Sequence, residues 1–432
     1  MKTILFLLII LSTGICQTIT NRYGQSSVLV DKKLYFFGGI ISNNSLPLNQ
    51  LLQLDLSKSF NTTNPPFEIL NVATPFGGSF TTAFLSPQKD VIYIYGGVTI
   101  NSITINSDAL LHTFNLETNK WDIPKTKGIV NMIRSHISGV INNETGKFYA
   151  FGGNDGISTV DVLDGIDILD VNSLTWSGSS LIDVVPPIPV LVDYTATLLP
   201  NGFIIFIGGY ALASNAFQYI DMNNNILYNT KTDKWARTTT QGVVETRGAH
   251  SAVLTPDQRI IIYGGFNGNG NVINQLAVLD TKANPFSWSI PSVSGGISPI
   301  LNCHSSALVG NYMFMIFGKN SPDDIGTYDE SQAPFFYILD VSNPENYTWV
   351  TQFGLENSPT TTAVNTLPTD NGENGKKNPE KPDNGNGRKI GIIFGIIISI
   401  VVSIAGFLVY RFLKKRNMNR YAPQAKQCVS YN

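Results

Sequence analysis

Six copies of one apolar phrase, each running into glycine, constrain the fold of this 432-residue chain more than any other feature. Five copies end in a Gly-Gly pair, as in RIIIYGG at residues 259–265. The sixth, MFMIFGK, ends at Lys319 and is interpreted as having lost the second glycine. The first glycines lie 58, 56, 56, 56 and 54 residues apart, at Gly38, Gly96, Gly152, Gly208, Gly264 and Gly318. A period of this length predicts a repeat architecture.

Each repeat predicts four strands, lettered A to D. A short strand rich in small residues precedes the apolar phrase; a third strand ends in Asp or Asn, and a fourth begins near an aromatic residue. An apolar strand without alternation is covered on both faces, as in a radial stack of small sheets. We expect the fourth-strand aromatics to fill the wedge between sheets: Trp121, Trp176, Trp235, Trp288 and Trp349, with Phe60 or Phe67 in repeat one.

The combination of apolar strand, Gly-Gly pair, Asp-ending strand and Trp resembles the kelch repeat. In kelch repeats the first strand often begins Arg-x-x-His, and this chain has Arg247-Gly-Ala-His250 and Arg134-Ser-His136. The resemblance implies an all-β, six-bladed kelch-type β-propeller over residues 17–356. Six complete blades leave ring closure open, unless Thr18–Thr20 pairs with the last blade.

Both ends of the chain predict targeting segments. Residues 1–16 predict a signal peptide, because Lys2 is followed by the apolar run Ile4–Leu11 and then by small residues; a buried first strand is the alternative. Residues 357–389 are rich in Pro, Thr, Asn, Gly and Lys and predict a disordered stalk. Residues 390–410 hold 21 uncharged residues, enough to span a bilayer, with a core helix as the alternative.

Charge is distributed unevenly on the two sides of the predicted membrane span. The tail, residues 411–432, carries six basic and no acidic residues, which predicts a cytosolic tail resting on anionic lipid. The propeller would then be extracellular or lumenal, in a single-pass protein most consistent with the plasma membrane. All 31 acidic residues precede the span. An acidic exterior argues against nucleic acid as a partner.

Loop positions predict two different faces. In an antiparallel blade the A–B and C–D loops open on one face, and the B–C and D–A loops on the other. Three glycosylation sequons, Asn61, Asn143 and Asn346, fall in A–B or C–D loops, whereas Asn43 falls in a B–C loop. Sugar would therefore mostly coat the first face and leave the B–C/D–A face free.

The B–C/D–A face is the predicted site of partner binding, because variable loops on a rigid scaffold commonly carry recognition. We expect a protein or glycan ligand there. The candidate partner-binding residues are Arg134, Arg247, Tyr210, Phe217, Phe266 and Tyr328. The alternative for the two arginines is a repeat-signature role in structural hydrogen bonds.

No catalytic residue, metal site or cofactor is predicted, and the favoured function is a non-enzymatic binding ectodomain. Galactose oxidase resembles the kelch fold and uses copper with a Tyr–Cys crosslink, so a copper oxidase is the alternative. Cys303 is the sole cysteine expected outside the membrane, and no ligand set accompanies it. His136, His250 and His304 are assigned to one equivalent position in three repeats, where a structural role is favoured over metal binding.

Overall fold

The structure is a computed structural model and describes residues 19–41, 44–99, 111–128, 130, 133–155, 165–179, 181, 187–213, 216–296, 298–319 and 335–354. These residues belong to one compact unit that ends at Ser358. The predicted signal peptide, stalk, membrane span and tail lie outside the described residues and stay predictions, as do Asn43 and Tyr328. Within the described ranges, no helix is both long and apolar enough to cross a membrane.

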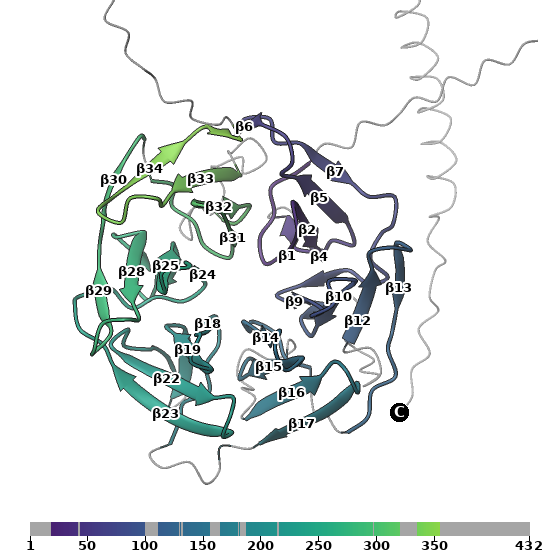
Figure 1. Cartoon of the computed structure of the whole chain (residues 1–432), viewed down its shortest axis with the longest axis horizontal. Coiled ribbons are helices and arrows are strands. Elements are labelled where there is room, and N and C mark those ends of the chain that lie inside the picture. The colour runs from purple at the N-terminus through teal and green to yellow at the C-terminus, as the bar shows by residue number, and fades with distance from the viewer. Residues whose placement is uncertain are drawn as a thin grey trace, which may run out of the picture. The chain divides into compact units, whose positions relative to one another are not determined.

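Six antiparallel sheets surround a common centre, each with strands A to D from the inside outwards (Figure 1). Blade one consists of β1 (Ser26–Val30), β2 (Lys33–Phe37), β5 (Leu51–Asp55) and β7 (Phe67–Ile69), and blade two of β9 (Thr82–Leu85), β10 (Val91–Tyr95), β12 (Leu111–Asn115) and β13 (Lys120–Asp122). Blade three consists of β14 (Val140–Asn142), β15 (Lys147–Phe151), β16 (Ile166–Asp170) and β17 (Thr175–Ser179), and blade four of β18 (Thr195–Leu198), β19 (Phe203–Ile207), β22 (Asn224–Asn229) and β23 (Lys234–Thr239). Blade five consists of β24 (Ser251–Leu254), β25 (Arg259–Tyr263), β28 (Leu276–Asp280) and β29 (Ser287–Ser289), and blade six of β31 (Ser305–Val309), β32 (Tyr312–Ile316), β33 (Phe336–Asp340) and β34 (Asn346–Val350). The predicted all-β, six-bladed propeller is confirmed.

The remaining short strands lie outside the four-stranded core of the blades. β30 (Ser292–Ser294) runs parallel to β34 and extends the sixth blade to five strands. On the B–C side lie the pairs β3 (Ile40–Ile41) with β4 (Asn44–Pro47), β8 (Gly78–Ser79) with β11 (Val98–Thr99), β20 (Tyr210–Ala213) with β21 (Ala216–Tyr219), and β26 (Phe266–Asn267) with β27 (Gly270–Asn271). Three of these pairs are hairpins within B–C loops, whereas β8 with β11 joins the segment leading into blade two to the start of its B–C loop.

The apolar phrase is buried on both faces, as its sequence predicts. In β25, residues 260–263 are all inaccessible to solvent. Their side chains alternate between two clusters: Ile260 and Ile262 pack with Ile207 of the preceding blade, whereas Ile261 and Tyr263 pack with Met313 of the following blade. Burial of apolar surface contributes roughly 25 cal/mol per Å². The main stabilisation therefore lies between blades.

The wedge aromatics pack as predicted. Trp176 lies 5.1 Å from Tyr95 of the preceding blade, between ring centroids, and Trp349 lies 5.6 Å from Tyr263. In the first blade Phe67, rather than Phe60, takes the tryptophan position, because it pairs with the penultimate residue of its C strand, as each Trp does.

The sixth glycine pair is shifted by one residue from the predicted alignment. Phe317 directly follows β32 and occupies the place of the first glycine, with a left-handed φ of 62°. Gly318 takes the second place, because its N–H donates to the Arg22 carbonyl at 2.6 Å, just as Gly265 donates to the Leu301 carbonyl. The interpretation of Gly318 as first glycine and Lys319 as a lost second one is therefore wrong.

Ring closure repeats the ordinary contact between blades. The Gly318–Arg22 bond joins blade six to the segment leading into blade one, and Asn21 adds a bond from Nδ2 to the Gly318 carbonyl at 3.1 Å. On the outside, β35 (Gln352–Phe353) pairs with β6 (Phe60–Asn61) of the first blade. Closure thus uses the residues directly after Thr20 and no exchanged blade strand.

Candidate functional site

Six residues, one from each blade, form a closed hydrogen-bonded ring at the centre, here named the axial ring. Each lies just before an A strand with a left-handed φ of 51–65°: Gly24, Phe80, His136, Asp193, Ala249 and Cys303. The N–H of each donates to the carbonyl of its counterpart in the preceding blade, over 2.6–3.3 Å, and Gly24 closes the circle on Cys303. The backbone alone therefore fixes six side chains around one axis.

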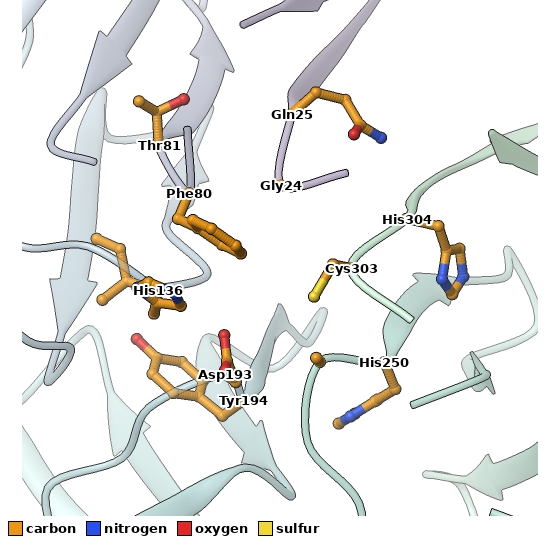
Figure 2. Close-up of a pocket in the computed structure, with 12 residues that line it drawn as sticks. Gly24, Gln25, Phe80, Thr81, His136, Asp193, Tyr194, His250, Cys303 and His304 are labelled. Carbon is orange, nitrogen blue, oxygen red and sulfur yellow. The ribbon is translucent and has the colours of Figure 1, made fainter. Parts of the chain in front are cut away.

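The axial ring surrounds a cavity of about 130 Å³, here named the axial pocket (Figure 2). The residue after each ring member completes its wall: Gln25, Thr81, Ile137, Tyr194, His250 and His304. The segments leading into the A strands also pair with the start of the B–C loops, as Val192 does with Tyr210. The axial pocket therefore lies at the B–C/D–A end of the blades.

The pocket combines one acid with aromatic rings. The Tyr210 hydroxyl donates to Asp193 Oδ2 at 3.1 Å, and no Lys or Arg of the described ranges forms an ion pair with Asp193. Burial raises the pKa of Asp193. Phe80 stacks on His136 with 3.9 Å between centroids. Burial also raises the pKa of the Cys303 thiol, so this thiol is protonated and unreactive at neutral pH.

Two histidines below the ring tie neighbouring blades together. His250 Nε2 lies 2.9 Å from Thr195 Oγ1, and His304 Nε2 lies 2.7 Å from Ser251 Oγ. Burial lowers the pKa of both, that of His304 to about 3, so both are neutral at pH 7.

The predicted equivalence of three histidines is corrected, because His136 stands one place earlier and belongs to the axial ring. Across the described ranges, no group of three His, Cys, Asp or Glu side chains is placed to hold a metal ion. The sequence-based metal interpretation thus gains no support from the geometry.

The two predicted arginines hold the B–C loops of their own blades. Arg247 is 0% exposed and donates from Nη1 to the Gly264 carbonyl at 3.1 Å and from Nη2 to the Asn274 carbonyl at 2.8 Å. Arg134 pairs with Asp167 and donates to the Gly152 carbonyl at 2.7 Å. These are the bonds expected of a structural role, while contact with a partner stays a prediction.

A third arginine of this kind was not predicted. Arg22 donates to the Gly38 carbonyl at 3.4 Å and to Gln50 Oε1 at 2.8 Å. It precedes a segment without the expected histidine, so the motif did not identify it.

Three of the predicted partner residues share one aromatic cluster. Tyr210 packs against Phe217 at 5.0 Å and Tyr219 at 5.7 Å, and Tyr219 reaches Phe266 at 6.2 Å. Phe217 is 51% exposed. We name these four residues the aromatic rim; Tyr219 is the member that sequence reasoning missed. Through the Tyr210–Asp193 bond the rim connects directly to the axial pocket.

Asp193 and Phe80 were also missed. Each axial ring residue lies 14–16 residues before the first position of its glycine pair. That narrow range of offsets is the sequence signal that could have found them.

The described sequons stand where the blade order predicts. Asn143 lies in the exposed A–B turn of blade three, Asn61 in the C–D connection of blade one, and Asn346 at the start of β34. Use of these sites for glycosylation stays a prediction.

Known proteins give a consistent picture. The Attractin/LZTR1 beta-propeller family model matches residues 11–268, and the KLHDC2/KLHL20/DRC7 Kelch-repeats domain matches residues 193–364. The chain is 25% identical over 345 residues to Kelch domain-containing protein 3 of Bos taurus, covering 74% of this chain and 85% of that protein.

Two other relatives are longer proteins. Acyl-CoA-binding domain-containing protein 5 of Arabidopsis thaliana is 25% identical over 66% of this chain, and Host cell factor 2 of Homo sapiens is 32% identical over 31%. The chain spans 43% and 17% of their lengths. Because the first family model covers more than half of the residues, this chain is a kelch-repeat protein of the Attractin/LZTR1 beta-propeller family.

Proposed function

We propose that this chain is a non-enzymatic binding module that engages a protein through the B–C/D–A face. Kelch propellers typically serve as protein-interaction domains. The observation that carries the proposal is the aromatic rim beside the axial pocket, in which Phe217 is exposed and the other three residues are half-buried. Aromatic side chains supply large contact area at low entropy cost and are enriched where binding energy concentrates.

The proposed setting is the outer side of a membrane, most simply the plasma membrane. The support is the sequence: a signal-like leader, an apolar run at 390–410 and a basic tail after it. Three of the four sequons lie on A–B or C–D connections, so glycosylation there would leave the B–C/D–A face accessible. The propeller would then present its loops to partners in the surrounding space.

The test is binding of the full chain, reconstituted in lipid nanodiscs, to arrays of extracellular protein domains and of glycans. We expect a protein ligand whose binding survives EDTA and is lost in Phe217→Asp. The matched control is Gln88→Asp, which introduces the same charge in an exposed A–B turn at the other end of the blades. Equal loss in both variants, or in neither, would contradict the assigned face. A hit confined to glycans would replace the protein ligand by a glycan.

The copper-oxidase alternative has its own measurement. Stoichiometric copper in the purified chain together with oxidase activity would displace the proposal. Neither the relatives nor the described side chains supply an observation in favour of it.

A further inference from the structure

Within the proposed binding face, and resting on that proposed function, we infer that the axial pocket receives one arginine side chain of the partner, with Asp193 as its charge partner. The pocket is small: about 130 Å³ is less than the 300 Å³ or more of a drug-sized site. A volume of this order suits one long side chain rather than a folded ligand. Four observations identify that side chain as a guanidinium.

The first observation is a carboxylate that forms no ion pair with any described Lys or Arg, with His136 as its titratable neighbour. Asp193 points into the pocket, and its hydrogen bond from Tyr210 is a neutral one (Figure 2). An ionised carboxylate offers about four acceptor positions. The amine of Lys319, a cation that acts on Cys303, lies 4.1 Å from the centroid of the Tyr23 ring. A carboxylate removed from water is costly unless a cation pairs with it, so the pocket favours a positive ligand.

The second observation is a buried acceptor without a donor, on a residue that lines the pocket. Gln25 is 8% exposed, and its Nε2 donates to Ser305 Oγ at 2.9 Å and to the Ile316 carbonyl at 3.2 Å. Because a carbonyl can only accept, this bond fixes which amide atom is the nitrogen. Gln25 Oε1 then remains buried without a partner. A buried acceptor left unsatisfied costs free energy, which a donor on the ligand would recover.

The third observation is an aromatic face beside these acceptors. One face of the Phe80 ring stacks on His136, and Phe80 remains partly exposed towards the cavity. The face of an aromatic ring attracts a planar cation, and arginine is the side chain that most often uses this contact.

The fourth observation concerns hydrogen-bond capacity. Among the described residues that line the pocket, the buried polar atoms without a hydrogen-bond partner are Gln25 Oε1 and Nδ1 of His250 and His304, and the Asp193 carboxylate accepts a side-chain bond from Tyr210. Arginine carries five N–H donors in a fixed fork and no acceptor. An acidic side chain would repel the Asp193 carboxylate, and an apolar side chain would leave that carboxylate without a cation. Neither would donate a hydrogen bond to Gln25 Oε1. The donor set and charge therefore select arginine over these classes.

The test measures binding of the acetylated, amidated peptide Gly-Gly-Arg-Gly-Gly to the full chain by calorimetry. The matched probes replace arginine by citrulline, which keeps the shape without the charge, and by norleucine. We expect a dissociation constant on the order of 1 mM for the arginine peptide, and at least tenfold weaker binding of both replacements. No measurable binding of the arginine peptide at 10 mM, on the order of ten times that constant, overturns the inference.

Variants assign the site. Asp193→Asn keeps a residue that tolerates left-handed φ and should weaken the arginine peptide at least tenfold. The control Asp122→Asn, at an exposed acid of β13, should leave binding unchanged. Gln25→Met, which removes the orphan acceptor at similar length, should weaken binding about threefold to tenfold. Wild-type affinity in Asp193→Asn, or citrulline binding as tightly as arginine, would overturn the assignment.

The outcome is separable from that of the proposed function. A protein ligand that depends on Phe217 but competes with no arginine peptide would sink the arginine pocket and leave the binding face standing. Arginine binding that depends on Asp193, with no ligand sensitive to Phe217→Asp, would support the arginine pocket and contradict the proposed binding face.

Discussion

The Phe317 ring stacks on the Phe67 ring, with 5.6 Å between centroids and 30° between planes, across the seam between blades six and one. These two residues are the two departures from the repeat: Phe67 replaces the wedge tryptophan and Phe317 replaces a glycine. At the other five seams a Cβ on the first glycine would lie 1.8–2.6 Å from a carbonyl oxygen. The smaller ring of Phe67 and the larger side chain of Phe317 compensate each other. Arg22 covers the Phe317 ring from 5.2 Å.

Phe317→Gly should destabilise the propeller although it restores the repeat pattern. Removing a buried phenyl group costs about 3–5 kcal/mol, and relief of the left-handed backbone returns about 1–2 kcal/mol. We expect a net loss of about 1–4 kcal/mol in the free energy of unfolding, measured by urea denaturation. A variant more stable than wild type would show that Phe317 lowers the free energy of unfolding and would contradict the proposed compensation.

Phe67→Trp tests the same compensation from the other side. The indole present at the other seams should overpack against Phe317 and cost about 1–3 kcal/mol. In the double variant Phe67→Trp/Phe317→Gly the two changes should be non-additive by at least 1 kcal/mol, because the residues are in contact. Additive losses would mean that the two departures are independent.

Asp193→Asn should be at least as stable as wild type at pH 7. The folded-state pKa of Asp193 is raised by burial, with Tyr210 and His136 as its polar and titratable neighbours. The folded protein therefore holds this proton more tightly than the unfolded chain, and ionisation at higher pH opposes folding. The advantage of Asn should shrink as pH falls towards 3.8, the ordinary value. Melting temperatures of both proteins at pH 4 to 7 measure it; a constant difference would contradict the assigned cause.

His304→Gln should make the protein less sensitive to acid. The pKa of His304 falls from 6.5 to about 3 in the folded state, so the unfolded chain binds the proton first as pH drops. This histidine costs stability progressively between about pH 6.5 and pH 3. Urea midpoints at pH 7 and pH 5 should therefore differ less in the variant, whose amide nitrogen can still bond to Ser251 Oγ. An unchanged pH dependence would count against the neutral buried state.

Arg247→Ala should loosen the B–C loop of blade five. The carbonyls of Gly264, Asn274 and Gln275 lose a side-chain donor, although Gln275 still accepts from the Gly264 N–H, and the loss should cost about 1–3 kcal/mol. Hydrogen exchange should accelerate at the amides of residues 264–275 and stay unchanged in the corresponding loop of blade three. Loss of a binding partner with unchanged exchange would instead support direct contact by this arginine.

The fold was predictable because glycine pairs and wedge aromatics report backbone geometry directly. Phe67 was one of two candidates, and only its pairing with Leu54 decided between them. The register of the sixth repeat was not predictable, since a phenylalanine gives no sign that its φ is positive. Asp193 was not predicted for a similar reason. The backbone conformation sets the position of an axial ring residue, and the six ring residues have no common side-chain type. The arginines were identified, but their burial was decided by loop carbonyls distant in sequence.

The axial ring has a consequence for how such a protein can change. Its six hydrogen bonds involve only peptide groups, and it already accommodates glycine, phenylalanine, histidine, aspartate, alanine and cysteine. The one demand on an occupant is tolerance of a left-handed backbone. New ligand preference can therefore arise by exchanging single side chains, blade by blade, without rebuilding the scaffold. Evolution or design can therefore change the chemistry of the axial pocket by single substitutions at the axial ring positions.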